Sequence, residues 1–482
     1  MRKSAWRTPR AVTTSTEDRP PWIARLGALA VGVAIWFIPP PEGLTVDAWR
    51  LFAIFFATIA SVVAGAFPIL TASVFAAASA VLTGVLTPAQ AYAGFANSTI
   101  LLIIMAFLVA RAVVKCGLGQ RLGHLVVSRF GRSTLGLSYS IFVVDGLIAP
   151  AFPSNTARSG VLYPLVVGLA EAGGASPDRA DRRRLGGYLM FSGMVSLSLS
   201  SALWFTAMAA NPLGAELARS AGLEITFGSW LVASCVPTLT AMALLPWLLQ
   251  RIMSPEVTST PNAPAAAARA LAALGPLTRD EWIVAITFVG MVALWASAGF
   301  LGLDSTAVAL LGLGILLATS VLTLGDIAKE GDVLATFIWF AVLYTLSDQL
   351  NEMGFMGYLG QRLAGALGGL GPIPVYLALV IAYVLLHYLF VSQTAHLLAL
   401  FAVFLDVGIK LGVSTAPLAF MLLFASNFFS VITPQGSSAN LLFTGSGYLS
   451  QGELYRLGAM TTAISLLIYL VVATPWLMFV AR

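Results

Sequence analysis

Long apolar runs recur along the whole chain and restrict the folds that it can adopt. A helix needs about 20 apolar residues to cross the hydrocarbon core of a bilayer. Runs of about this length lie at 22–39, 48–66, 68–87, 98–116, 185–208, 226–250, 281–300, 305–324, 333–350, 415–432 and 457–480. Because 58% of the residues are hydrophobic and only 10% are charged, the sequence predicts an all-α polytopic membrane protein with about eleven transmembrane helices. A transmembrane barrel would instead show short strands of alternating polarity.

Two further apolar zones, 134–174 and 372–412, each contain a short polar cluster followed by a cation. The clusters are Ser154-Asn155-Thr156-Ala157-Arg158 and Ser392-Gln393-Thr394-Ala395-His396, whose first residues are 238 positions apart (392 minus 154). Unsatisfied polar groups are costly in lipid, and ionisable groups there usually serve a function. We therefore interpret both zones as re-entrant hairpins, and the matched clusters as a substrate site built from an internal repeat.

Other landmarks repeat in the same order in the two halves of the chain. Leu118-Gly119-Gln120-Arg121-Leu122 recurs letter for letter at 359–363, and an Ala-Asn pair follows each polar cluster, at 210–211 and 439–440. Four predicted crossings precede the first copy of the five-residue segment and nine precede the second, so the copies are expected on opposite faces of the membrane. This arrangement predicts an inverted repeat, from which alternating access follows naturally.

The basic residues are distributed in a way that supports this topology. They gather within the first 25 residues, at 115–132 and at 179–184. All three clusters obey the positive-inside rule if the N-terminus is cytoplasmic and zone 134–174 does not cross the membrane. The net charge of +5 is thus explained by topology and not by binding to nucleic acid.

The chain is expected to divide into four parts. A cytoplasmic tail at 1–21 precedes a first half at 22–251. A cytoplasmic linker at 252–280, which carries Pro255, Pro261, Pro264 and an Ala run, then leads to a second half at 281–482.

The composition of the first polar tip indicates how it would bind an anion. Pro150 and Pro153 suit a helix start, and Ser, Asn and Thr are favoured N-cap residues, so a helix is expected to begin near Ser154. Such a helix presents free N–H groups and a positive dipole end at the membrane midplane. The second tip predicts a mirror copy, and the pair suits a ligand with negative charge at two ends. The alternative is that Ser and Thr only hold neighbouring helices together.

A further interruption at 433–438 breaks another apolar run. Backbone that leaves the helical form at membrane depth is tolerated where it lines a cavity, so we expect this segment to lie beside the two tips. A simple loop at the membrane surface is the alternative.

The chain resembles the divalent anion/sodium symporter family over nearly everything after the N-terminal tail. Four segments carry the resemblance, at 149–160, 337–340, 392–396 and 432–440. The similarity is greatest to plastid 2-oxoglutarate/malate translocators and bacterial citrate/succinate or tartrate/succinate antiporters. It implies eleven spans, two re-entrant hairpins and a homodimer whose transport domains move elevator-fashion. It also implies a set of residues that hold the substrate carboxylates: Ser154, Asn155, Thr156, Ser392, Gln393 and Thr394, with Thr433 and Pro434 as a third contact.

The cations of the two clusters bear on how transport is driven. A dianion needs compensation in a low-dielectric barrier, and we expect Arg158 and His396 to supply positive charge where symporters use bound cations. A fixed charge cannot leave the empty site, so transport would become obligatory exchange. The alternative is that Arg158 pairs with an acid such as Asp145 and His396 with a backbone carbonyl. Gln393, where sodium-coupled members usually have Asn, and the Ser200–Thr206 segment also argue against sodium coordination.

The sequence thus predicts a sodium-independent exchanger of C4 or C5 di- or tricarboxylates in the bacterial inner membrane. A sodium-coupled symporter for dicarboxylates or other divalent anions is the alternative, with sodium as its coupling ion. We expect no catalytic residue, cofactor or metal site, because His-Glu-x-x-His, Gly-x-Ser-x-Gly and P-loop motifs are missing and the three histidines are scattered. A channel is disfavoured because nothing resembles a selectivity filter.

Overall fold

The computed structural model describes residues 21–177, 185–367 and 369–481. These ranges form helices joined by loops and contain no β-strand; one isolated bridge joins Ser133 and Ser259. Within them, nine helices are long and apolar enough to cross a membrane, and four shorter apolar helices accompany them. The all-α membrane fold is confirmed, whereas the number of eleven spans stays a prediction. Residues 1–20 of the expected tail and the arginines at 179 and 182–184 lie outside the described residues.

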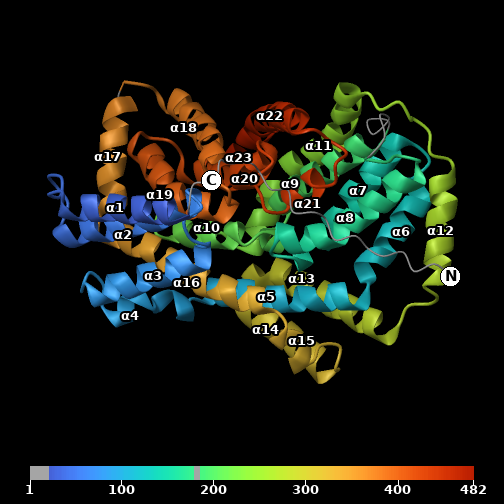
Figure 1. Ribbon diagram of the computed structural model, residues 1–482, viewed down its shortest axis with the longest axis horizontal. Helices are drawn as coiled ribbons and strands as arrows, with labels where there is room; N and C mark the ends of the chain where they lie inside the picture. Colours follow the sequence, from blue (N-terminus) through green and yellow to red (C-terminus); the bar gives the residue numbers. More distant parts are fainter. Residues whose placement is uncertain (1–20, 178–184, 368, 482) are drawn as a thin grey trace.

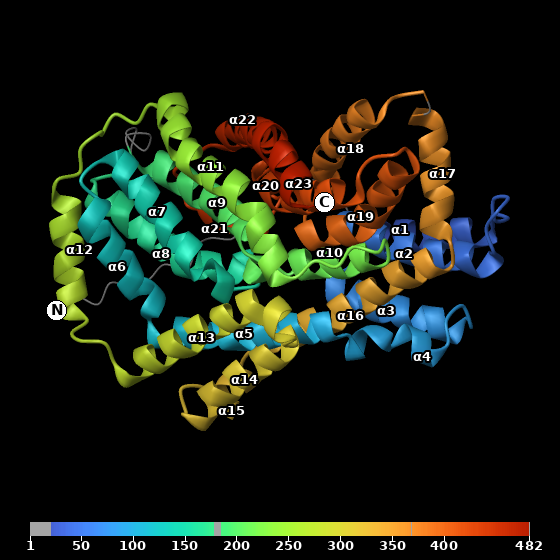
Figure 2. The same cartoon turned by 180° about the vertical axis from the view of Figure 1, so that it is seen from behind.

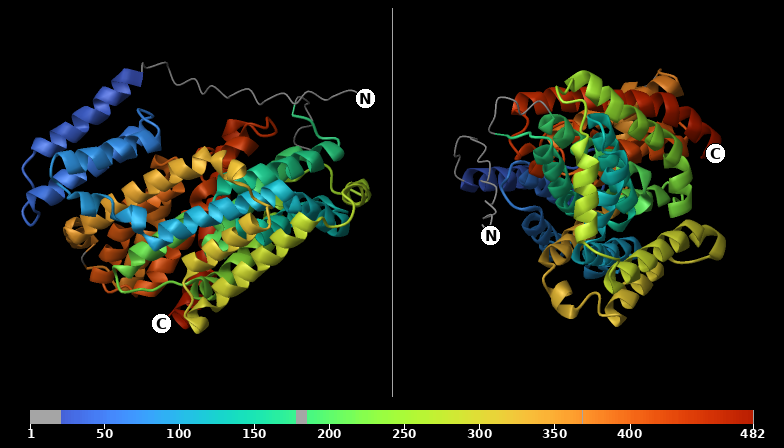
Figure 3. Two further views of the ribbon diagram at one scale, coloured as in Figure 1. Left: turned by 90° about the horizontal axis from the view of Figure 1, so that it is seen from below. Right: turned by 90° about the vertical axis from the view of Figure 1, so that its right-hand side faces the viewer.

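The helices form two groups that lie side by side (Figures 1 and 2). The first group comprises α1 (Pro21–Phe37), α2 (Val46–Val63), α3 (Ile69–Leu82), α4 (Pro88–Ala91), η1 (Ala93–Ala96), α5 (Ser98–Cys116), α13 (Arg279–Leu301), α14 (Ser305–Ala318), α15 (Leu324–Ala328) and α16 (Gly331–Glu352). The second comprises α7 (Thr134–Ile148), α8 (Asn155–Ala172), α9 (Gly186–Leu203), α10 (Ala210–Arg219), α11 (Phe227–Met253), α18 (Pro372–Leu386), α19 (Gln393–Lys410), α20 (Thr415–Phe428), α21 (Asn440–Thr444), α22 (Gln451–Ile468) and α23 (Thr474–Val480). In the left view of Figure 3, α5, α13 and α16 run along one another within the first group.

Two helices, α6 (Leu118–Phe130) and α17 (Phe355–Leu367), connect the first group to the second. Each contains one copy of Leu-Gly-Gln-Arg-Leu, so the sequence repeat marks equivalent connectors. The expected linker also contains a helix, α12 (Asn262–Ala273), which its Ala-rich sequence favours because Ala has the highest helix propensity. Helix α12 packs against α6. Arg121 of α6 pairs with Glu281 of α13, with 2.6 Å between Nε and Oε1, and this ion pair joins the connector to the first group.

The two apolar zones that carry the polar clusters both fold as helical hairpins. The first consists of α7, the 3-10 turn η2 (Ala149–Ala151) and α8; the second consists of α18, η4 (His387–Leu389) and α19. Pro150 lies in the first turn and lacks a backbone donor, which helps to end the preceding helix there. Both tips lie inside the protein, since Asn155 and Gln393 are 6% and 5% exposed. That the hairpins do not cross the membrane stays a prediction.

Each hairpin is followed by a helix that breaks and then resumes. Helix α9 leads through η3 (Phe205–Ala207) to α10, and α20 leads through η5 (Phe429–Val431) and a turn to α21. Asn211 and Asn440 stabilise the two breaks in the same way: each Nδ2 donates to two backbone carbonyls, ten and seven residues earlier in the chain. The Ala-Asn pairs of the sequence are therefore equivalent positions in two similar structural units. Their inversion across the membrane stays a prediction.

We predict that Gly94→Ala destabilises the first helix group. A Cβ at this position would collide with the carbonyl oxygen of Ala341 and lie 2.5 Å from Thr345 Oγ1, both on α16. The expected loss is about 1–3 kcal/mol, the usual cost of overpacking, measured as a lower thermal unfolding midpoint in detergent. Gly290→Ala in α13 is the control, because nothing lies within 4 Å of its added Cβ. Equal midpoints for the two variants would contradict this account of η1 packing on α16.

Candidate functional site

The two hairpin tips have nearly identical local geometry. Ser154 and Ser392 both adopt extended backbone conformations, with φ/ψ of −140°/122° and −139°/124°. Each serine caps the following 18-residue helix: Ser154 Oγ accepts from the N–H of Ala157 at 3.2 Å, and Ser392 Oγ from that of Ala395 at 3.3 Å. The helix starts expected near both serines are thus confirmed. The remaining N–H groups of a first turn have no partner within their helix, which suits an anion.

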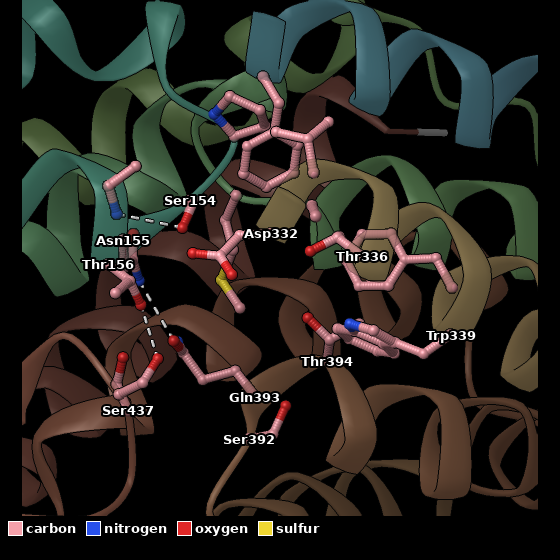
Figure 4. A pocket seen from close by; sticks show the side chains of 18 of the residues that line it. Ser154, Asn155, Thr156, Asp332, Thr336, Trp339, Ser392, Gln393, Thr394 and Ser437 are labelled. Carbon is pink, nitrogen blue, oxygen red and sulfur yellow. Dashed lines mark hydrogen bonds between the residues drawn. The ribbon is translucent and has the colours of Figure 1, made fainter. Parts of the chain in front are cut away.

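Both tips open into one cavity of about 400 Å³. Six of the eight residues expected to bind substrate line it together, although the two triplets are far apart in sequence: Ser154, Asn155, Thr156, Ser392, Gln393 and Thr394. Figure 4 shows the first triplet facing the second across the cavity. Among the residues that line this cavity, none is Lys, Arg or His, so the two helix N-termini are the groups there that can attract an anion.

The third expected contact is displaced by a few residues. Thr433 and Pro434 do not line the cavity, whereas Ser437 and Ser438 of the same interruption do. Ser438 Oγ lies 2.6 Å from Thr156 Oγ1, in a hydrogen bond that joins the interruption to the first tip. Thr433 is buried behind this surface, and its carbonyl accepts from Asn440 Nδ2 at 3.2 Å. The segment 433–438 therefore lies beside the tips, as expected of a broken span and not of a surface loop.

One wall of the cavity comes from the first helix group and was not predicted. Asp332, Thr336, Trp339 and Phe340 occupy one face of α16, at helical spacing, and all line the cavity (Figure 4). The segment 337–340 contributed to the family resemblance, but an aromatic face in an apolar span is indistinguishable in sequence from ordinary core. The spacing of Asp332 and Thr336, one turn apart and next to that segment, was the available signal.

Arg158 does not reach the cavity. Its side chain is fully buried, and Nε lies 2.8 Å from Asp145 Oδ1 in an ion pair that is itself fully buried. The guanidinium also donates to four oxygens: Asn155 Oδ1 at 2.9 Å, Ser201 Oγ at 2.7 Å, and the carbonyls of Leu197 and Ala207 at 2.8 and 3.2 Å. The expectation that this charge faces the substrate is thus corrected, since Asp145 neutralises it inside the protein. The alternative pairing with Asp145 is the one observed.

His396 also lies behind its tip and away from the cavity. Its ring packs among aromatic rings, with centroids 4.4 Å from Tyr383 and 4.7 Å from Phe429. Neither ring nitrogen has a hydrogen-bond partner within the described part of the chain. The carbonyl bond considered for His396 is made instead by its neighbour, because His387 Nε2 lies 2.8 Å from the carbonyl oxygen of Gly436. The His396 ring therefore cannot contact a ligand in the cavity in this conformation.

The middle residues of the two tips hydrogen-bond to each other. Asn155 Nδ2 donates to Gln393 Oε1 at 3.2 Å, across the interface of the two hairpins (Figure 4). Gln393 Nε2 in turn donates to the carbonyl of Ser426 at 2.9 Å, which anchors this side chain to α20. The two halves of the chain therefore meet at the candidate site. Across the residues that the structure describes, no group of three or more His, Cys, Asp or Glu could hold a metal ion.

The chain matches one protein family over residues 20–482, and that family is described as the sodium:sulfate symporter transmembrane region. It is 38% identical to YflS of Bacillus subtilis (strain 168), whose name describes a proposed malate transporter, with 93% of this chain and 94% of the relative covered. It is 36% identical to chloroplastic dicarboxylate transporter 1 of Spinacia oleracea, with 94% and 80% covered. It is 31% identical to the L-tartrate/succinate antiporter of Escherichia coli O157:H7, with 95% and 98% covered.

The fold is also similar to a solved structure. The YdaH transporter of Alcanivorax borkumensis, described as having an unusual topology, superposes with a TM-score of 0.59. The superposition covers 81% of this chain and 87% of the other, at 16% sequence identity. At this level of identity the likeness concerns the fold alone.

We predict that Asp145→Asn strongly destabilises the protein, because it leaves a buried guanidinium without its counter-charge. The expected cost is about 3–5 kcal/mol, seen as a lower thermal unfolding midpoint in detergent. The double variant Asp145→Asn/Arg158→Met should recover only part of this loss, because it removes the uncompensated charge but also the hydrogen bonds that Arg158 donates. Asp280→Asn, at the exposed pair with Arg279, is the control and should change the stability by less than about 1 kcal/mol. An unchanged midpoint for Asp145→Asn would show that the buried pair contributes nothing.

Proposed function

The chain belongs to the sodium:sulfate symporter family, and from that premise we propose that it is a secondary transporter which exchanges C4 or C5 dicarboxylates across a membrane. The observation that carries the proposal is the pair of Ser-capped helix N-termini that share one cavity. Two positive helix ends suit a ligand with a carboxylate at each end. Three curated relatives that match over nearly the whole chain have names that specify malate, dicarboxylates or tartrate and succinate.

Sodium independence is supported by hydrogen bonds to the backbone carbonyl oxygens behind the two tips. These are the oxygens that could otherwise coordinate a cation. Behind the first tip, the Arg158 guanidinium takes the carbonyls of Leu197 and Ala207. Behind the second tip, the equivalent carbonyls of Ser426 and Gly436 are taken by Gln393 Nε2 and by His387. Ala207 and Gly436 lie in the breaks of the two helices, and unwound backbone carbonyls of this kind hold coupling ions in other transporters of inverted-repeat design. With these oxygens already hydrogen-bonded, a sodium ion would have to share them with buried donors or displace a buried side chain.

Exchange is expected because moving the site across the membrane without a bound anion costs electrostatic free energy. Without an anion, two positive helix ends would pass the low-dielectric barrier with no opposing charge. A bound dicarboxylate offsets them, so the loaded site crosses more readily than the empty one. This argument replaces the one based on a fixed charge at Arg158, because Asp145 already neutralises that side chain.

An elevator movement in a homodimer is part of the proposal. The tips and Ser437 belong to the second helix group, whereas Asp332, Thr336 and Trp339 belong to the first, so the cavity lies between the groups. Movement of the second group past the first, with α6 and α17 as connectors, would carry the tips and leave the α16 wall behind. Bacterial relatives favour a bacterial inner membrane, and the distribution of basic residues favours a cytoplasmic N-terminus.

A sodium-coupled symporter is the second candidate, and one observation favours it. Thr433 Oγ1 and Asn427 Oδ1 are buried oxygens near the second tip that lack a hydrogen-bond partner in the described part of the chain. Orphaned oxygens of this type are available to a cation. The two candidates differ in their need for sodium and for internal substrate.

The prediction that separates them is made in proteoliposomes. We expect rapid uptake of labelled malate or succinate into vesicles preloaded with unlabelled dicarboxylate, and little uptake into empty vesicles, with the same result in sodium and in potassium. Protein-free vesicles preloaded in the same way are the control. Sodium-driven uptake into empty vesicles would instead establish the symporter.

The cavity also favours dicarboxylates over tricarboxylates. Within the described part of the chain, the charged residues that line the cavity are Glu330 and Asp332. Glu330 is paired with Arg111 at 2.9 Å, whereas the Asp332 side chain is exposed at the cavity wall (Figure 4). Two helix ends supply only about half a positive charge each, so a third carboxylate would face Asp332 without compensation.

We therefore predict that Asp332→Asn increases the uptake of citrate relative to succinate by roughly 3- to 10-fold, the effect of one like-charge repulsion near a protein surface. The ratio of initial counterflow rates measures this directly, and it should depend less on salt in the variant. Asp304→Asn, at the start of α14 and away from this cavity, is the control. A ratio that stays at the wild-type value would remove Asp332 from the account of specificity.

A further inference from the structure

The two amides at the centre of the cavity have unambiguous orientations. The Arg158 guanidinium can only donate, so the oxygen of Asn155 must face it; Ser201 Oγ lies 2.5 Å from the same oxygen and from the carbonyl oxygen of Leu197. The carbonyls of Ser426 and Asn427 can only accept, so the nitrogen of Gln393 must face them, at 2.9 and 3.4 Å. Asn155 therefore turns its NH₂ group, and Gln393 its oxygen, toward the other tip.

This arrangement makes the two tips chemically different where they meet. Asn155 Nδ2 uses one hydrogen on Gln393 Oε1 and keeps a second, while Gln393 Oε1 keeps a second lone pair. The pair therefore offers one donor and one acceptor side by side. In an ordinary carboxylate clamp both amides would present N–H groups, which is not the case here for Gln393.

A ligand that bridges the tips must pass along this amide pair. Asn155 and Gln393 are the first residues of α8 and α19, each between a capping serine and a cavity-lining threonine. If the two carboxylates of a C4 acid lie at the two helix starts, its middle carbons lie beside the Asn155–Gln393 bond. A substituent on a middle carbon is then the group to which Asn155 and Gln393 can hydrogen-bond.

We infer that Gln393 makes the site selective for 2-hydroxydicarboxylates, an inference that rests on the proposed transport of dicarboxylates. A hydroxyl group both donates and accepts, so it complements the remaining lone pair of Gln393 and the remaining N–H of Asn155. A keto oxygen at the same carbon would face Gln393 Oε1 oxygen to oxygen. An unsubstituted dicarboxylate would shield both groups from water and leave them unpaired, which a site built for a hydroxyl rejects.

The extra methylene of Gln393 is what fixes its orientation. In the first half, the carbonyl of Leu197 is taken by Arg158, and the shorter Asn155 is held by that arginine. In the second half no arginine stands behind the tip, and Gln393 itself reaches the carbonyl of Ser426. Asn at position 393 would be too short to make both bonds, and its amide would be free to turn an N–H toward the ligand.

The test measures counterflow by purified protein in proteoliposomes preloaded with malate. External unlabelled acids compete with a labelled dicarboxylate for uptake. Two neutral hydrogen bonds correspond to about tenfold in affinity, so wild-type protein should be inhibited by external L-malate at roughly a tenth of the concentration needed for succinate or oxaloacetate. In Gln393→Asn protein these concentrations should come within about twofold of each other, whatever the absolute counterflow rate, because the hydroxyl preference depends on the fixed oxygen. Ser392→Ala, which removes a cap, should weaken all three ligands by a similar factor.

Two outcomes would overturn the inference: wild-type protein that binds malate and succinate equally, or Gln393→Asn protein with an unchanged malate preference. If wild-type protein shows no counterflow with any of the three acids, the proposed function fails instead. Ligand-induced rises in the thermal midpoint of the detergent-solubilised protein still rank malate against succinate in that case. Equal rises at equal concentrations would then overturn the inference by itself.

Discussion

Helix ends that stop at membrane depth must find their hydrogen-bond partners within the protein, because lipid supplies none. This constraint governs the centre of the structure. Ser154 and Ser392 cap α8 and α19, and Asn211 and Asn440 take up carbonyls that the breaks after α9 and α20 release. The first turns of α8 and α19 also have N–H groups without a partner inside their own helix, and the residues of both helix starts line one cavity. In the proposed function, these helix starts are where the anion binds.

The two halves of the chain orient the amide at each hairpin tip with different side chains. Behind the first tip lies a buried ion pair of Asp145 and Arg158; at the same spacing behind the second tip lie Tyr383 and His396, in ring contact at 4.4 Å. The first half therefore orients its amide through a charged side chain, and the second through an additional methylene in Gln393. A repeated backbone with unlike side chains gives one site two distinguishable ends. That asymmetry places a donor and an acceptor side by side at the centre of the cavity.

The cavity depends on contacts between elements that are distant in sequence. Its α16 wall belongs to the first helix group, while its floor belongs to two hairpins of the second. Charged contacts at the periphery, such as Arg121 with Glu281 and Lys115 with Asp326, hold connectors and loops of the first group in place. Both helix groups thus line the cavity, and a relative movement of the groups would change which residues face each other across it.

Pattern and composition alone determined the helical membrane fold, the two hairpins and six of the residues that meet in the cavity. They could do so because bilayer-length apolar runs and N-cap residues act locally, within a few turns of helix. Thr433 and Pro434 were placed a few residues away from Ser437 and Ser438, since the path of an irregular segment depends on what surrounds it. Asp332 and Trp339 had no role assigned, because which face of α16 meets the tips is decided by packing. The partners of Arg158 and His396 were left open for the same reason: whether a buried cation faces a ligand or an internal acid is a matter of a few ångströms, and only the tertiary structure sets that distance.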